Sequence, residues 1–407
     1  MTDSMAYAAA VLRRCDELAA FSEEGGRLTR RFGTAALREA GETVREWMEA
    51  AGLVVRRDAI GNVIGRLGDG DHRTLLIGSH LDTVPDAGRY DGMLGVLVAI
   101  GCLERLRDQR RSVRYAVEVL AFADEEGVRF ATGYLGSSVV AGRFDSADLE
   151  RRDADGVRLA DAVRAFGGDP DGLAGARRDP DDLIGYYEVH IEQGPVLEAA
   201  GVPLGVVDAI AGQTRARVTF TGEAGHAGTV PMALRHDALC AAAEFVTAVE
   251  AVARGEDGVV ATVGELDVRD GASNVVPGVV ALSLDVRHAA DAVREFVGAR
   301  LRERAQAIAG TRGLVVDWQV VQETRAVDCS SKLSELVAEA VTASGHPVVG
   351  LPSGAGHDAA MLSTITPVAM LFVRCAGGVS HNPAESVTVE DVAAAIDTTT
   401  CFLELVE

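Results

Sequence analysis

Lysine is almost absent from this chain of 407 residues, in which Lys332 stands alone among arginines. Mechanisms that use a lysine as a nucleophile or in a Schiff base are therefore excluded, unless Lys332 is the group involved. Positive charge is also scarce, since the chain has 39 basic and 61 acidic residues and a formal net charge of −22. Nucleic acids and anionic membranes attract basic patches, so neither is expected as a partner. This balance is typical of a soluble cytoplasmic enzyme.

Cysteine is sparse as well, and its spacing contains no CxxC pair of the kind found in zinc knuckles and redox motifs. We expect the cysteines to be reduced and mostly buried. No apolar run approaches the ~18 residues of a membrane span, and residues 1–10 lack the basic segment of a secretion signal. The sequence therefore predicts a cytoplasmic protein that is neither secreted nor inserted in a membrane.

The length exceeds what one compact core usually holds, so two domains are expected. Short apolar runs at 63–67, 74–78 and 115–123 are bounded by Gly and Asp, and a long apolar helix is expected at 93–106. Strands that alternate with helices predict an α/β sheet with parallel pairs.

The pattern changes after residue 210. Four strands and two helices are expected there in the order β-α-β-β-α-β, the split βαβ arrangement of ferredoxin-like domains. These elements are expected at 214–221, 237–252, 259–268, 275–286, 289–309 and 314–321. Such a unit can fold as its own layer, so we predict a domain at 211–324 inserted into a domain formed by 1–210 and 325–407.

The C-terminal part supports a return to the first domain. Residues 348–351 and 368–373 predict buried strands. Residues 390–406 predict a closing helix, with Thr388 as its N-cap.

Nine histidines are present, and several stand, like a number of acidic residues, just past apolar runs. In an open α/β sheet, ligand-binding groups gather at the carboxyl ends of the strands. Five such positions could therefore converge on one crevice. They are His80, Asp91, the run Asp124-Glu125-Glu126, His190 and His381.

Imidazole and carboxylate ligands without thiolate suit zinc, manganese, cobalt or nickel. Two metals need a bridging carboxylate, for which Asp91 is the natural candidate. Ions about 3.5–4 Å apart can polarise a carbonyl and lower the pKa of a water, which then needs a base. Adjacent side chains point to different sides, so one of Glu125 and Glu126 can bind metal while the other faces the water. Asp82 can accept the second ring N–H of His80.

Each of these features also has an ordinary structural explanation. A single histidine at a strand end is more often a satisfied polar residue, a Glu-Glu pair is usually a solvated strand end, and Asp-Gly is usually a turn. The conjunction of five ligand-type positions after five apolar runs, each flanked by small residues, is what favours a metal site.

Six stretches together resemble the hydantoinase/carbamoylase family of binuclear metal amidohydrolases, within the clan of di-zinc aminopeptidases and deacylases. They are SHLDTV at 79–84, YDG at 90–92, DEEG at 124–127, HIEQG at 190–194, GHAG at 225–228 and SHNP at 380–383. The resemblance runs from around residue 30 to the C-terminus. It implies an α/β fold: a di-zinc aminopeptidase-like catalytic domain with a mixed central sheet flanked by helices, plus an inserted ferredoxin-like lid or dimerisation domain.

The resemblance also implies two divalent metal ions per subunit, zinc or manganese with cobalt or nickel as alternatives, and a homodimer formed through the inserted domain. One metal would be held by His80, Asp91 and His190, and the other by Asp91, Glu126 and His381. Glu125 is then the general base, and Asp82 orients His80. Peptidase relatives usually carry a carboxylate at the position of His190, so this histidine indicates the carbamoylase branch.

Family members hold an N-carbamoyl amino acid through residues that match Gln193, His226, Asn274, Arg287 and Gly356 here. By this resemblance Arg287 binds the α-carboxylate, which suits its guanidinium geometry. His226 donates to the developing oxyanion and, in relatives, comes from the partner subunit. Taken by itself, an arginine in the alternating stretch 282–287 is by default a surface residue or the partner of an aspartate. His357, in a glycine-rich loop, is expected to line the pocket.

The resulting hypothesis is hydrolysis of the carbamoyl C–N bond of a small ureido carboxylate, which yields ammonia and carbon dioxide. Closure of the inserted domain, hinged near 209–212 and 324–328, would complete the site. The stretches 86–92, 124–130 and 225–232 most resemble the allantoate amidohydrolase branch.

Alternatives stay open. They are an N-carbamoyl-L-amino-acid hydrolase or β-ureidopropionase, and a dipeptidase or aminoacylase of the same clan. A binding or scaffold protein with a dead site is the non-enzyme alternative, but such a protein would lack a ligand or the base, and all of these residues are present.

Overall fold

The computed structural model describes residues 3–68 and 73–406. Residues 1–2, 69–72 and 407, which fall in the predicted catalytic domain, lie outside the described residues. The chain forms two compact units, which we name unit 1 (Met1–Asp208, Cys329–Leu351 and Ala355–Glu407) and unit 2 (Ala209–Asp328 and Pro352–Gly354). The assignment of these parts as a catalytic domain and an inserted lid or dimerisation domain stays a prediction.

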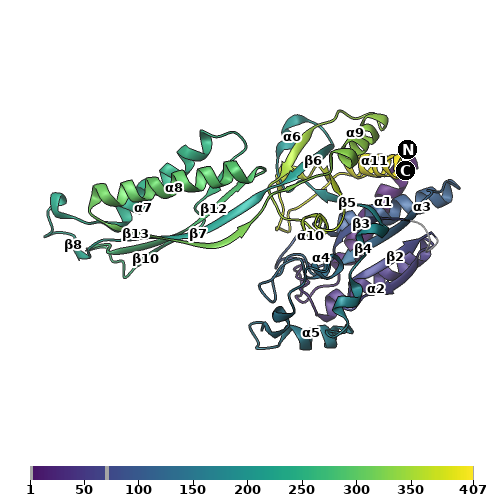
Figure 1. Ribbon diagram of the computed structural model, residues 1–407, viewed down its shortest axis with the longest axis horizontal. Helices are drawn as coiled ribbons and strands as arrows, with labels where there is room; N and C mark the ends of the chain where they lie inside the picture. Colours follow the sequence, from purple (N-terminus) through teal and green to yellow (C-terminus); the bar gives the residue numbers. More distant parts are fainter. Residues whose placement is uncertain (1–2, 69–72, 407) are drawn as a thin grey trace. The chain divides into compact units, whose positions relative to one another are not determined.

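A mixed sheet organises unit 1, with strand order β1-β2-β4-β3-β5-β16-β6 and with β15 also paired to β6 (Figure 1). Its strands are β1 (Val54–Arg57), β2 (Val63–Leu67), β3 (Thr74–His80), β4 (Ala116–Phe122), β5 (Leu183–Ile191), β6 (Leu204–Ile210), β15 (Gly350–Ser353) and β16 (Val368–Val373). The neighbours β4, β3, β5 and β16 are parallel, whereas β1–β2, β2–β4 and β16–β6 are antiparallel. The predicted α/β class with a mixed central sheet is therefore confirmed.

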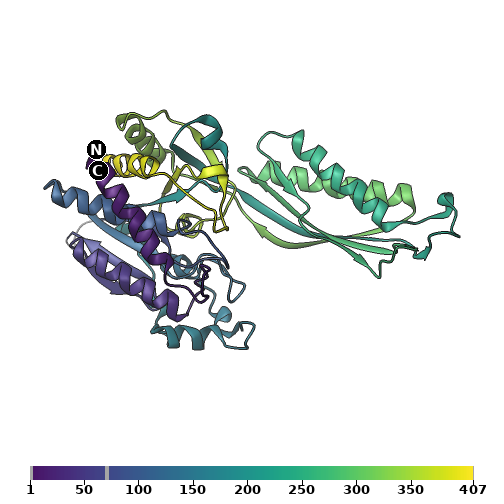
Figure 2. The ribbon, with the colours of Figure 1, turned by 180° about the vertical axis from the view of Figure 1, so that it is seen from behind.

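Helices cover this sheet. They are α1 (Asp3–Ala19), α2 (Ala35–Ala50), α3 (Met93–Asp108), α4 (Leu135–Ala141), α5 (Leu159–Phe166), α6 (Val196–Ala200), α9 (Ser331–Ala343), α10 (Asp358–Leu362) and α11 (Val389–Leu405). The apolar helix α3 packs on β3 and β5 and is covered in turn by α1 and α11, which also pack on each other (Figure 2). This burial on opposite sides explains why α3 reads as apolar almost all round.

Unit 2 contains an antiparallel sheet in the order β10-β12-β7-β13, with β9 also paired to β12. Helices α7 (Ala238–Arg254) and α8 (Asp291–Arg312) pack on this sheet and share one apolar core with it. The strands are β7 (Gly212–Thr221), β9 (Val260–Thr262), β10 (Leu266–Arg269), β12 (Val279–His288) and β13 (Val315–Thr324). A separate two-stranded ribbon joins β8 (Gly225–His226) to β11 (Val275–Val276). Short β14 (Val327–Asp328) pairs with Ala209 and Ile210.

Two predicted strands of this region are wrong as single elements. The stretch 259–268 is broken at 263–265 into β9 and β10, which pair with different parts of β12. The stretch 275–286 is broken between β11 and β12 by Pro277 and Gly278. A proline has no N–H for a ladder, which explains the second interruption.

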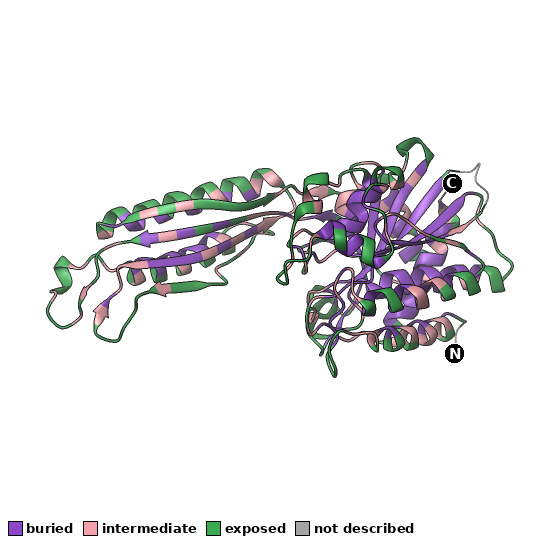
Figure 3. Ribbon diagram, turned by 90° about the horizontal axis from the view of Figure 1, so that it is seen from below, coloured by how far each residue is buried: buried purple, intermediate pink, exposed green. Residues whose placement is uncertain are grey.

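The two faces of the unit 2 sheet differ. Leu282, Leu284 and Val286 are buried in the core beneath the helices, as the alternation in the sequence predicts. Figure 3 shows this change between buried and less buried positions along the strands of unit 2. Side chains at the alternate positions, such as Asp285 and Arg287, therefore lie on the face without helices.

Two further expectations concern the burial of the cysteines and the presence of membrane-spanning helices. All six cysteines are free, and Cys15, Cys102 and Cys375 are buried, but Cys240 is exposed, so only half of them fit the expected burial. Over residues 3–68 and 73–406, none of the helices is both long and apolar enough to cross a membrane.

Thr388 caps helix α11, as predicted. Its hydroxyl oxygen accepts a hydrogen bond from the Asp391 amide at 3.1 Å and donates to the Asp391 carboxylate at 2.7 Å. We predict that Thr388→Ala lowers the free energy of unfolding by about 1 kcal/mol, because an amide of the first helical turn loses its acceptor. Chemical denaturation checks this against Thr388→Ser, which keeps the hydroxyl. Equal stability of the Ala and wild-type proteins would contradict it.

Candidate metal centre

The ligand-type residues of unit 1 meet at one edge of its sheet. His80 ends β3, Glu125 and Glu126 follow β4, and His190 lies near the end of β5. These strands are parallel to one another and to β16, after which the chain reaches His381. Parallel neighbours end at the same edge, so residues from four distant parts of the sequence come together there.

Asp91, which precedes α3, stands at the centre of the cluster. Its Oδ1 lies 3.5 Å from Nε2 of His80 and 3.1 Å from Nε2 of His190. Its Oδ2 lies 3.3 Å from Nε2 of His381, which is also 3.4 Å from Oε1 of Glu126. The groups His80–Asp91–His190 and Asp91–Glu126–His381 each offer ligand atoms within 4.8 Å of one another. The structure thus brings both predicted ligand sets together, and their role as metal ligands stays a prediction.

The histidines are oriented for metal binding. Nδ1 of His80 lies 3.1 Å from the carbonyl oxygen of Asp82, and Nδ1 of His190 lies 3.0 Å from that of Ile191. A ring nitrogen that donates to a carbonyl leaves the lone pair of the other nitrogen free. Nε2 of His190 is buried and makes no hydrogen bond with any described residue. A buried imidazole nitrogen that lies 3.1 Å from the Asp91 carboxylate, in a group with a second imidazole, fits a divalent cation.

Hydrogen bonds fix the Asp91 carboxylate. Its Oδ2 accepts from Nε2 of Gln193 at 2.9 Å and from the Ser380 hydroxyl at 2.8 Å. Burial alone would raise the pKa of Asp91, but interactions with the imidazoles of His190, His381 and His80 hold that pKa well below its ordinary value. Oε1 of Gln193, a residue predicted to bind substrate, is buried and has no hydrogen-bond partner among the described residues. This oxygen is therefore suited to accept a hydrogen bond from a ligand.

Glu385 links two loops of the site. Its Oε1 accepts the amide hydrogens of Tyr90 at 2.8 Å and of Asp91 at 3.1 Å, and its Oε2 lies 3.3 Å from the Ser380 hydroxyl. Burial, reinforced by the charge of Asp91, raises the pKa of Glu385 to about 7. Ser380 enters the prediction only as part of the stretch SHNP at 380–383, and Glu385 is not predicted, although it stands four residues after His381.

Asp82 supports both sides of the cluster. Its carboxylate accepts the amide hydrogens of Glu125 at 2.9 Å and of Glu126 at 3.1 Å. Oδ1 of Asp82 also lies 3.4 Å from Nδ1 of His80, farther than the carbonyl oxygen of the same residue. Asp82 was predicted to orient His80, and its hydrogen bonds show that it also orients the backbone of Glu125 and Glu126.

Glu125 belongs to the same cluster, in a group with His80 and Glu126. Burial raises the pKa of its carboxyl well above the ordinary value; His80 opposes this rise, and the charges of Glu126 and Asp358 add to it. A carboxylate that readily takes up a proton is suited to act as a general base.

Gly356, His357 and Tyr134 form another part of this site. A Cβ atom at Gly356 would lie 1.8 Å from the hydroxyl oxygen of Tyr134, so only glycine fits there without a shift. The His357 ring is buried, with its centroid 4.5 Å from that of His190. Burial, and after it the charge of His190, lowers the pKa of His357 well below its ordinary value, so this imidazole is neutral. Tyr134 is not among the predicted site residues, because its contact with Gly356 joins two distant parts of the chain.

The remaining predicted substrate residues belong to unit 2. His226 in β8 pairs with Val275, and the amide of Ala227 donates to the carbonyl oxygen of Asn274 at 2.9 Å, so His226 and Asn274 are neighbours. Arg287 pairs with Gln213, eight residues along β12 from the end that leads back to β11. Eight strand residues span about 26 Å. Within unit 2, the structure therefore does not bring His226 and Asn274 to Arg287.

Comparisons with known proteins identify the class. Residues 76–405 match the profile of peptidase family M20/M25/M40, and the chain belongs to this family. It is 42% identical over 373 residues to an N-carbamoyl-L-amino acid amidohydrolase of Geobacillus stearothermophilus, covering 91% of each chain. It is also 42% identical over 415 residues to an allantoate deiminase of Arabidopsis thaliana, covering 94% of this chain and 79% of that one.

A solved structure agrees. The crystal structure of a hydantoinase/carbamoylase family amidase from Burkholderia multivorans matches with a TM-score of 0.91 and 32% identity, over 98% of this chain and 97% of that one. The predicted resemblance is confirmed: the chain is a hydrolase of C–N bonds, similar to the amidohydrolases of this metal-dependent family. The non-enzyme alternative is thereby set aside.

We predict that Asp91→Ala lowers bound divalent metal from about two ions per chain to less than one, because both ligand sets lose the carboxylate they share. Elemental analysis after dialysis measures the metal. His236→Asn, at an exposed histidine of unit 2, is the control. Wild-type metal content in folded Asp91→Ala would contradict the assignment.

Glu125→Gln retains the metal and loses at least about a hundredfold in turnover, as expected for a general base. Elemental analysis measures the metal, and a steady-state assay measures turnover.

Proposed function

We propose that this chain hydrolyses the carbamoyl C–N bond of an N-carbamoyl carboxylate, with allantoate as its substrate. The observation that carries the proposal is the buried Asp91 carboxylate within reach of three imidazoles, one of which, His80, also lies in a group with Glu125. The names of relatives at about the same identity support a carbamoyl-cleaving amidohydrolase.

The residues take the following roles. Two divalent cations, when bound, would act as Lewis acids toward a carbonyl and a water. The residues that would hold them are His80, Asp91, Glu126, His190 and His381. Glu125 removes a proton from the attacking water and delivers it to the leaving nitrogen. A C–O bond forms and the C–N bond breaks, and the carbamate product decomposes to ammonia and carbon dioxide. Oε1 of Gln193 accepts a hydrogen bond from the ureido nitrogen.

The substrate carboxylate binds Arg287, whose planar guanidinium matches it. Arg287 belongs to unit 2, so the proposal includes a movement that carries unit 2 over the metal centre, hinged near 209–212 and 324–328. Such a closure excludes water from the reacting groups.

His226 and Asn274 act, we propose, in the site of a partner subunit. A ureido carboxylate is far shorter than the about 26 Å of strand that separates them from Arg287 within one chain. One small molecule therefore cannot touch both ends of the same unit 2. A homodimer formed through unit 2 would supply His226 to the developing oxyanion from the second chain.

The choice of allantoate depends on the stretches 86–92, 124–130 and 225–232, which most resemble that branch. The similarity to an N-carbamoyl-L-amino acid amidohydrolase, at 42% identity over 91% of the chain, makes such compounds the second candidate. Both substrates offer a carboxylate to Arg287 and a ureido group to the metal centre, and β-ureidopropionate shares these groups. A dipeptide or an acylated amino acid would use the same centre for a peptide amide.

Steady-state assays test this choice. We expect the highest kcat/KM on allantoate, lower values on N-carbamoyl-L-amino acids and β-ureidopropionate, and the lowest on dipeptides and acyl amino acids. The protein is stripped with a chelator and reconstituted with manganese, cobalt, nickel or zinc in turn, which identifies the metal that supports turnover. A preference for dipeptides, or full activity after complete chelation, would overturn the proposal.

Mixing two inactive variants tests the dimer. Glu125→Gln lacks the base, and His226→Ala lacks the donor that we assign to the partner's site. A mixed dimer then has one site with both groups, so random mixing restores about a quarter of wild-type activity. Sedimentation of the wild-type protein confirms or refutes the dimer directly. No recovery in mixed dimers would show that His226 does not act across subunits.

A further inference from the structure

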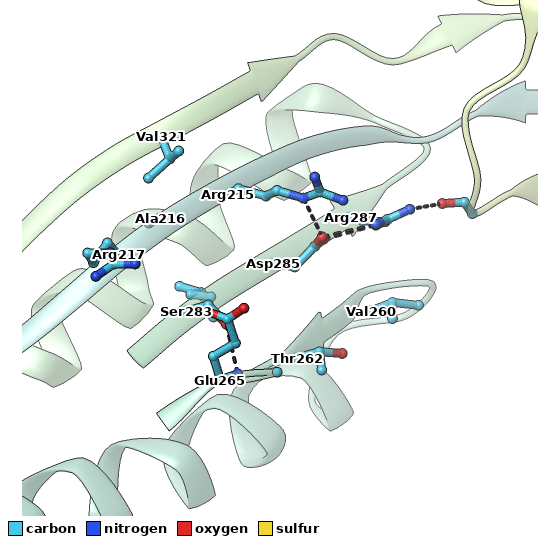
Figure 4. Close-up of a pocket in the computed structure, with 13 residues that line it drawn as sticks. Arg215, Ala216, Arg217, Val260, Thr262, Glu265, Ser283, Asp285, Arg287 and Val321 are labelled. Carbon is cyan, nitrogen blue, oxygen red and sulfur yellow. Dashed lines mark hydrogen bonds and ion pairs between the residues drawn. The ribbon is translucent and has the colours of Figure 1, made fainter. Parts of the chain in front are cut away.

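A pocket of about 790 Å³ lies on the face of the unit 2 sheet that carries no helices (Figure 4). Arginine is unusually frequent in its lining, with Arg215 and Arg217 from β7 and Arg287 from β12. In a chain with a formal net charge of −22, such a pocket stands out as basic. Asp285 and Glu265 are the acidic residues that line it.

Asp285 holds Arg287 in one orientation. Nε of Arg287 donates to Oδ1 of Asp285 at 2.9 Å, and Nη2 donates to Oδ2 at 3.0 Å. Nη1 donates to the carbonyl oxygen of Gly354 at 2.7 Å. A guanidinium has five N–H donors, so one donor on each terminal nitrogen is left over. Two such donors on a fixed planar group suit a carboxylate.

Asp285 also binds a second arginine. Nε of Arg215 donates to Oδ2 of Asp285 at 3.0 Å, and Nε2 of Gln213 donates to the same oxygen at 2.7 Å. Figure 4 shows the carboxylate between the two guanidinium groups. Burial alone would raise the pKa of Asp285, but Arg287 and then Arg215 lower it overall, so the group is ionised at neutral pH.

The charges therefore do not cancel. Asp285 alone with Arg287 would form a neutral pair, and an incoming carboxylate would meet no net attraction. Arg215 adds a second positive charge to the same carboxylate, which leaves one positive charge in excess at Arg287. Arg217 and Glu265 line the pocket with opposite charges and do not change this excess.

We propose that Asp285 and Arg215 are positioning residues for the substrate carboxylate: Asp285 fixes the orientation of the Arg287 guanidinium, and Arg215 offsets the negative charge of Asp285. The three residues act as one carboxylate-binding unit with a net charge of plus one. This inference rests on the proposed function, because it takes Arg287 as the group that binds the carboxylate.

Removing the charge of Arg215 tests its part. We expect Arg215→Met to raise KM for allantoate about fivefold, with a smaller change in kcat, because Arg215 acts on binding through a partly exposed charge. Arg215→Lys restores KM to within about twofold, since a lysine keeps the charge. The primary amide of allantoate, which lacks the carboxylate, shows the same KM with wild-type and Arg215→Met. Arg302→Met, at an exposed position of α8, is the matched control for charge and leaves KM unchanged.

Asp285→Asn separates orientation from charge. This change makes the pocket more positive, so charge alone would lower KM for allantoate. The proposal expects KM to rise instead. Asparagine has a single side-chain oxygen, so it cannot accept hydrogen bonds from both Nε and Nη2 of Arg287 on separate oxygens.

The outcomes separate this inference from the proposed function. If wild-type protein hydrolyses no ureido carboxylate, the proposed function fails and takes the inference with it. If wild-type protein is active but Arg215→Met leaves KM for allantoate unchanged, only the inference is overturned. A lower KM in Asp285→Asn, or an equal rise for the amide in Arg215→Met, would also overturn it.

Discussion

The carboxylate of Asp91 is the constraint on which the rest of the site depends. Three imidazoles approach its two oxygens, at 3.1 to 3.5 Å. Such a concentration of polar groups in a buried place is costly unless each group is held and paired. The four parallel strands bring the groups to one edge, Gln193 and Ser380 hold the carboxylate, and backbone carbonyls turn the rings. The hydrogen bonds at this edge of the sheet therefore hold the Asp91 carboxylate and the imidazoles around it in place.

The ligand-type residues could be predicted because each follows an apolar run, and a parallel sheet places such positions together. Supporting residues could not be predicted in the same way. Glu385 stands before α11, and its importance comes from accepting amide hydrogens of Tyr90 and Asp91, almost 300 residues away. Tyr134 matters because its hydroxyl meets Gly356. Contacts between distant loops leave no periodic pattern in the sequence.

The fold shows a similar division. Continuous apolar runs that end at Gly or at polar residues mark buried elements, so α3, β2 and β16 could be placed closely. The split of 259–268 into β9 and β10 could not, because a short run with one Gly fits either arrangement. The position of β3 between β4 and β5, which decides where His80 lies, is a long-range pairing that no local pattern encodes. The same is true of the pairing that sets Asp285 opposite Arg215.

The hydrogen bonds from the Nδ1 atoms of His80 and His190 to backbone carbonyls have a consequence for the proposed metal centre. Ligands that are already turned and locked by the main chain do not have to be ordered when a cation arrives. Ion capture and release are then separate from folding, unlike in small zinc domains, where the two are one event. We therefore expect the proposed centre to exchange one divalent ion for another as supply in its surroundings changes, without unfolding of the chain.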